Sequence, residues 1–151
     1  QQYQYDNCSP EHPTAIMTIL GTDDFTSPYE GLVWGGETYY VSADDMHSYW
    51  VNYNNTNLDP IVNAIPNTNM SDGSTVDRRS WVDGDNCVSV EELRVNNGGH
   101  DWPGLRFDWW NPLYYLARYQ MGFGRTRDID SSKIITDFFV EVARRGRAEP
   151  R

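Results

Sequence analysis

The chain has 151 residues, 38% of them apolar and 14% aromatic, and 22 acidic residues against 12 basic ones give it a net charge of −10. This composition is that of a globular domain and excludes a disordered polyacid. The negative charge argues against nucleic acid as a partner. The longest apolar run, residues 14–20, is too short to span a bilayer, so no membrane association is expected.

The first predicted element is a short buried strand over residues 14–20. The run TAIMTIL is apolar, partly β-branched and followed by Gly21, which is typical of a parallel strand that ends in a sharp loop. The next segment, GTDDFTSPYEG, is therefore expected at the C-terminal end of that strand.

A helix is expected over residues 42–53, because Ser42 is a good N-cap. Four apolar side chains recur at helical spacing and are expected to face the core: Met46, Tyr49, Trp50 and Tyr53. His47 then falls on the solvated side of this helix and is interpreted as incidental.

Residues 54–74 are rich in Asn, Asp, Ser, Thr and Pro, and this composition predicts a loop. Two strands are expected over 76–82 and 88–95, because the DGDN between them is a hairpin signal. The second strand runs directly into NNGGHDWPG.

The remainder holds an aromatic-rich excursion and a terminal helix. The dense rings of residues 105–130 suggest either a packed excursion or a loop that contacts substrate. Ser131 or Ser132 is expected to cap the final helix, and Gly146 is expected to end it. One apolar stripe follows its length: Ile134, Ile135, Phe138, Phe139 and Val142.

Two ionisable residues lie in loops that follow strands, Asp24 in the first loop and His100 in the second. Catalytic groups of open α/β sheets collect at the carboxyl ends of parallel strands. The chain between the two residues is long enough for a crossover to a neighbouring parallel strand. Asp24 and His100 could then meet, the carboxylate fixing the imidazole tautomer and leaving Nε2 to accept a proton.

The strings GTDDFTSPYEG and VNNGGHDWPG, with a terminal helix that contains DFF, resemble the C-terminal half of the polyhydroxybutyrate depolymerase and feruloyl esterase family of α/β hydrolases. The resemblance implies an α/β class chain that forms the C-terminal portion of one α/β-hydrolase domain over residues 1–151: the last parallel strands, a hairpin and the terminal helix. By its motifs, the acid maps onto Asp24 and the base onto His100.

Other residues compete for these roles. Asp23 neighbours Asp24, but the family spacing to Pro28 favours Asp24. His12 is interpreted as incidental. Trp102 either lines the acyl pocket, as a substrate-binding residue, or packs the loop.

The resemblance implies a secreted serine esterase that cleaves feruloyl or acetyl esters of plant polysaccharide, or a polyester. No cofactor or metal is expected, because the three histidines are scattered and no HExxH or EF-hand loop occurs. The alternative is a non-catalytic carbohydrate-binding or structural module that uses exposed Trp and Tyr rings.

We expect the nucleophile to lie outside this chain. None of its ten serines has glycine two residues away on both sides, whereas an α/β hydrolase presents its serine in a G-x-S-x-G elbow ahead of the acid and the base. We therefore expect the serine, the oxyanion-hole amides and the central strands to lie in an N-terminal half of the same domain, as a partner to this chain.

Two features favour export. Cys8 and Cys87 each precede a strand of the expected parallel pair and would meet at the opposite edge of the sheet from the active site as a disulfide; two reduced thiols are the alternative. Glycosylation sequons begin at three asparagines: Asn7, Asn54 and Asn69.

Overall fold

A computed structural model of the chain describes residues 10–105, 112 and 126–148. Along them run β1 (Ile16–Gly21), β2 (Leu32–Trp34), β3 (Glu37–Tyr40), α2 (Ala43–Tyr53), β4 (Ile61–Ile65), β5 (Thr75–Trp81), the 3-10 turn η1 (Asp85–Cys87), β6 (Val90–Asn96) and α4 (Ser131–Ala148). Within these ranges no helix is long and apolar enough to cross a membrane.

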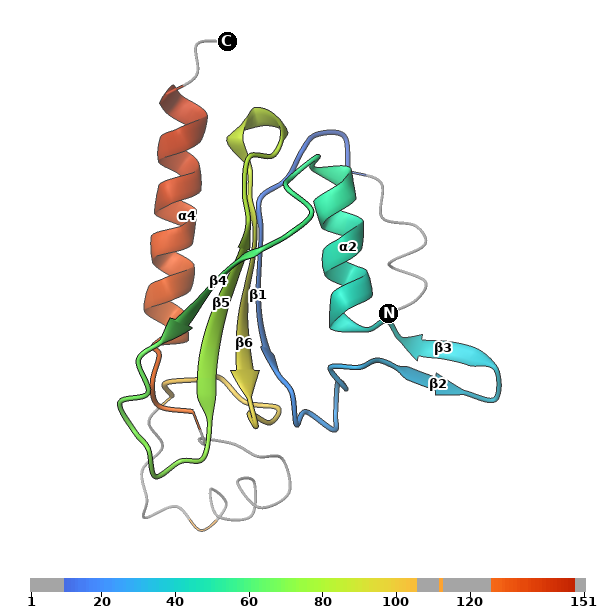
Figure 1. Cartoon of the computed structure of the whole chain (residues 1–151), viewed down its shortest axis with the longest axis vertical. Helices are drawn as coiled ribbons and strands as arrows, with labels where there is room; N and C mark the ends of the chain where they lie inside the picture. The colour runs from blue at the N-terminus through green and yellow to red at the C-terminus, as the bar shows by residue number, and fades with distance from the viewer. Residues whose placement is uncertain (1–9, 106–111, 113–125, 149–151) are drawn as a thin grey trace.

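One mixed sheet of four strands has the order β1-β6-β5-β4. β1 and β6 pair in parallel, whereas β6, β5 and β4 are successively antiparallel. The helices α2 and α4 lie on opposite sides of this sheet (Figure 1). The parallel pair and the hairpin β5–β6 are as the sequence predicted.

Each face of the sheet carries its own apolar cluster, because side chains alternate along a strand. Beneath α2, Val51, Trp81 and Val90 are buried together. On the α4 side a second cluster contains Leu93 and Val95. β6 thus contributes to both clusters and is the most enclosed strand, with Val90, Glu92, Leu93 and Val95 all buried.

Three expectations about the elements were wrong. Residues 61–65 were predicted as loop but form the edge strand β4. Because Ile61 and Val62 remain exposed, this strand lacks the burial pattern by which a strand is predicted. The terminal helix is capped by Asp130 and not by a serine, because its Oδ1 accepts from the Lys133 N–H at 3.0 Å. That helix also continues past Gly146 to Ala148.

The short hairpin β2–β3, which projects away from the sheet (Figure 1), was not predicted, although its Gly-Gly pair is a hairpin signal. Its two-residue turn is Gly35-Gly36, and both glycines have positive φ, at 60° and 85°. Two-residue hairpin turns need such angles, which glycine adopts without steric cost.

Most of the aromatic-rich excursion lies outside the described residues. Seven rings belong to that part: Phe107, Trp109, Trp110, Tyr114, Tyr115, Tyr119 and Phe123.

Candidate active site

The parallel pairing of β1 and β6 brings two distant loops to one edge of the sheet. Gly21, at the end of β1, is in register with Val95 of β6. Beyond the strands, the Thr22 N–H donates to the Val95 carbonyl at 3.0 Å, and the Asp23 N–H donates to the Gly98 carbonyl at 2.8 Å. The loop that follows β1 is therefore fastened to the loop that follows β6.

Glycine permits this close approach. A Cβ atom on Gly21 would lie 2.4 Å from the carbonyl oxygen of Gly98 and 2.6 Å from that of Gly99. Because these atoms belong to the backbone, no side-chain movement could relieve the contact. Glycine at position 21 is thus a requirement of the paired loops.

Asp24 and His100 meet across the two loops, 76 residues apart in the chain. Nδ1 of His100 lies 2.8 Å from Oδ2 of Asp24. The other carboxylate oxygen, Oδ1, accepts from the N–H groups of Thr26 and Ser27, each at 2.8 Å. One oxygen therefore orders the acid's own loop while the other orients the imidazole.

This pair borders a cavity of about 190 Å³ that Gly99, Asp101 and Pro103 also line. The Asp24 side chain is 10% exposed, whereas that of His100 is 43% exposed. No hydrogen bond links Nε2 of His100 to any described residue, serines included. The imidazole is therefore oriented through Nδ1, and its partly exposed ring borders the cavity, an arrangement that suits a general base.

The competing residues lie elsewhere. Asp23 is exposed and contributes its backbone, not its carboxylate, to the loop pairing. His12 is also exposed. Trp102 is 48% exposed and donates from Nε1 to Ser132 Oγ at 3.2 Å. It does not line the cavity beside His100 but an apolar groove next to it.

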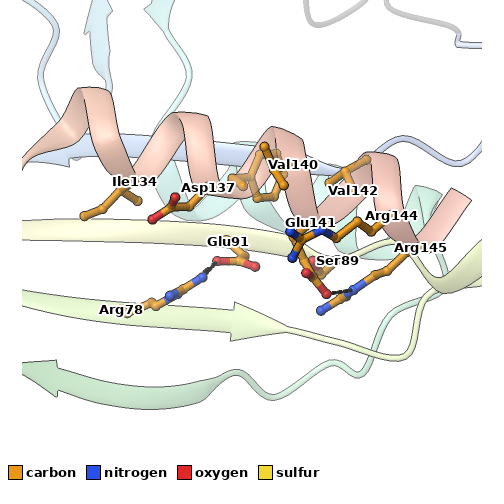
Figure 2. Close-up of a pocket in the computed structure, with 11 residues that line it drawn as sticks. Arg78, Ser89, Glu91, Ile134, Asp137, Val140, Glu141, Val142, Arg144 and Arg145 are labelled. Atoms are coloured by element: carbon orange, nitrogen blue, oxygen red, sulfur yellow. Dashed lines mark hydrogen bonds and ion pairs between the residues drawn. The ribbon is translucent and has the colours of Figure 1, made fainter.

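Two larger grooves flank α4. The apolar one, of about 400 Å³, lies between α4 and β1, where Met17, Ile135 and Phe139 line it. Figure 2 shows the other, of about 390 Å³, where the ion pairs Arg78–Glu91 and Glu141–Arg145 lie between α4 and the strands β5 and β6. We place the candidate site in the smaller cavity, because it alone among these three contains the imidazole and its carboxylate.

His47 was expected on the solvated side of its helix, and this expectation was wrong. Its side chain is 1% exposed and belongs to the face that α2 turns to the sheet, together with Ala43 and Val51. The spacing of these residues, four apart, is the signal that could have revealed that face. Nε2 of His47 lies 2.8 Å from Thr18 Oγ1, and its ring stacks on Trp81.

Burial lowers the pKa of His47 below its ordinary value, although the carboxylates of Glu92 and Asp44 oppose this shift and Arg79 adds to it. As the pH falls through about 6.5, His47 therefore binds a proton in the unfolded chain but remains neutral in the folded chain. We expect the free energy of unfolding to be highest above that pH and to decrease below it, with a slope from this group of up to about 1.4 kcal/mol per pH unit.

Urea unfolding between pH 8 and pH 5 measures this effect. His47→Gln should flatten the pH dependence, whereas the exposed His12→Gln control should leave it unchanged. An equal slope in the His47→Gln variant and in the wild-type chain would contradict the assignment.

The sequons and cysteines have separate outcomes. Asn54 is fully buried, and its amide exchanges two hydrogen bonds with the backbone of Thr14, at 2.8 and 2.7 Å. A glycan on that nitrogen is incompatible with this packing, so the expectation for Asn54 is corrected. Asn69 is half-buried and remains a prediction.

Asn7 and Cys8 lie outside the described residues. Cys87 is exposed in η1, a few residues ahead of β6. The disulfide between Cys8 and Cys87 stays a prediction.

Within the described residues, no group of three or more His, Cys, Asp or Glu side chains could hold a metal ion.

Comparison with known proteins gives no family for the chain. No protein-family model, no curated protein and no solved structure matches the chain.

Proposed function

We propose that this chain supplies the general base and its orienting acid to a serine carboxylic ester hydrolase of the α/β-hydrolase type. The observation that carries the proposal is the 2.8 Å contact between His100 Nδ1 and Asp24 Oδ2 at the border of a cavity. In such a pair, Nε2 takes the proton of a serine hydroxyl as that oxygen attacks the ester carbonyl, and returns it to the departing alcohol. The carboxylate keeps the imidazole in the required tautomer and stabilises the imidazolium.

The proposal assigns the nucleophile to polypeptide outside these 151 residues, as the N-terminal half of the same domain. Three observations support it: the chain has no G-x-S-x-G motif, no described serine bonds to His100, and β1 has β6 as its one neighbouring strand in the described sheet. Beside β1 runs the apolar groove in which Phe139 is 65% exposed, and apolar surface of this kind is typical of interfaces with other polypeptide and of ligand grooves.

The resemblance of the two loop motifs suggests feruloyl or acetyl esters of plant polysaccharide, or hydroxyalkanoate oligomers, as substrates. It also suggests a secreted enzyme, which the predicted disulfide would suit.

The test uses the native protein, purified from its source together with whatever polypeptide accompanies these 151 residues. This chain serves as the handle for capture. We expect it to hydrolyse methyl ferulate, acetylated xylan or hydroxybutyrate oligomers, and a fluorophosphonate probe to label one serine outside the 151 residues, located by peptide mapping. Labelling of a serine within this chain would overturn our assignment of the nucleophile. If the protein shows no hydrolysis of these esters and no labelled serine, the esterase function itself is overturned.

A second candidate is a carbohydrate-binding module without catalysis, and the hairpin β2–β3 favours it. Trp34 is 73% exposed on this projecting element (Figure 1), and an exposed ring of this kind can stack on a sugar. Retention on insoluble xylan by a protein that neither hydrolyses esters nor reacts with the probe would favour this candidate.

A further inference from the structure

A buried polar cluster lies under the loop that carries Asp24, on the α2 side of the sheet. At its centre is Glu92 of β6, whose side chain is fully buried. Oε1 of Glu92 accepts from the Tyr29 hydroxyl at 2.6 Å, and Oε2 accepts from Arg79 Nη1 at 2.9 Å. His47 Nδ1 lies 3.9 Å from the same Oε2. A carboxylate taken out of water is tolerated only with such partners.

Tyr29 anchors the loop that follows β1. Among residues 22–31 it is the one buried side chain, at 4% exposure, while the others are half-buried or exposed. Its ring lies under the guanidinium of Arg94, 5.0 Å away. Its carbonyl accepts from the Ala43 N–H at the start of α2, at 2.8 Å. Tyr29 therefore ties the acid loop to the sheet and to the helix.

The hydrogen bonds of Asp24 connect this anchor to the carboxylate. Because Oδ1 of Asp24 accepts from the N–H groups of Thr26 and Ser27, the chain from Asp24 to Ser27 is a closed turn that leads directly to Tyr29. The other end of the loop is fixed at Thr22 and Asp23. The place of the carboxylate thus depends on a tether at each end.

We propose that Tyr29 and Glu92 are positioning residues that hold Asp24 against His100. β6 then fixes both halves of the pair, since it carries Glu92 within the strand and leads into the loop of His100. Burial, reinforced by Glu92, raises the pKa of Tyr29. The hydroxyl therefore stays protonated, and remains a donor, over the pH range in which an esterase works. The inference rests on the proposed function only where activity is the readout.

The experiment compares Tyr29→Phe, which removes the hydroxyl and keeps the ring, with Tyr39→Phe on the exposed part of β3. The first readout is the tautomer of His100 in the full chain, from the nitrogen chemical shifts of its imidazole. We expect the wild-type and Tyr39→Phe chains to hold the Nδ1–H form and Tyr29→Phe to shift toward Nε2–H. The second readout is kinetic: in the native-context enzyme, kcat should fall about 10- to 100-fold in Tyr29→Phe with KM unchanged.

Glu92→Gln keeps an acceptor for Tyr29, so the tautomer of His100 in this variant should lie between those of the wild type and Tyr29→Phe. If Tyr29→Phe does not fold, the tautomer of His100 in Glu92→Gln decides the question. A folded Tyr29→Phe or Glu92→Gln chain with an unchanged tautomer would overturn the inference, because a merely structural role lowers stability without moving that proton. A tautomer shift without esterase activity in any form, wild type included, would leave the positioning role intact and overturn the proposed function instead.

Discussion

Replacing Asp24 with asparagine should lower kcat for ester hydrolysis by about 10⁴-fold while leaving the chain folded. The amide is nearly isosteric, and its oxygen can still accept the N–H groups of Thr26 and Ser27, which Oδ1 binds in the wild type. The group facing His100 Nδ1 then becomes an NH₂ donor, which favours the imidazole tautomer with its proton on Nε2. That nitrogen can no longer accept the proton of the nucleophile.

Asp23→Asn is the matched control, because it removes the same charge from the adjacent, exposed position. Steady-state hydrolysis by the native-context enzyme measures both variants, and kcat of Asp23→Asn should stay within about twofold of wild type, as expected for a surface change. Similar losses in the two variants, or a loss under tenfold in Asp24→Asn, would contradict the role of Asp24.

Gly21→Ala should damage both stability and catalysis. The new Cβ would meet the Gly98 carbonyl oxygen at 2.4 Å, so the ends of β1 and β6 must separate. Overpacking of this kind costs about 1–3 kcal/mol of unfolding free energy. Because Asp24 and His100 lie on the two separated loops, a displacement of about 1 Å should also lower kcat by about 100-fold.

Gly35→Ala distinguishes these effects. Its φ of 60° disfavours alanine, at about 1 kcal/mol, but a Cβ there meets nothing within 4 Å, and the position lies in the hairpin β2–β3. Urea unfolding should therefore show a loss in both variants, whereas kcat should fall only in Gly21→Ala. Equal kcat values for the two variants would show that the loop contact does not matter for catalysis.

The sequence predicted the elements that form the candidate site. The apolar run that became β1, the cap at Ser42 and the DGDN turn are local signals, and their chain order was enough to place Asp24 near His100. The prediction of this contact did not depend on the exact residue at which each strand ends. The carboxyl ends of neighbouring parallel strands lie at the same edge of the sheet in any case.

The missed features depend on tertiary contacts that leave no local pattern. In VEELRV either glutamate could face inward, and only the contacts of Tyr29 and Arg79 show that Glu92 is the buried one. His47 was misplaced because the aromatic stripe of its helix was assumed to define the buried face, whereas those rings are only half-buried. β4 is recognisable mainly by its pairing with β5.

The position of β1 at the end of the described sheet has a consequence for how activity is lost. One ladder of hydrogen bonds, to β6, holds β1 in that sheet, while β5 and β6 pair independently of it. Strands with a single neighbour open locally at lower free energy than the global unfolding of the domain. Because Asp24 follows β1 and His100 follows β6, such an opening would part the acid from the base in a molecule that is otherwise intact. We therefore expect the proposed activity to be lost before the domain unfolds globally, and we expect a cover of the proposed N-terminal half on the outer edge of β1 to reduce this difference.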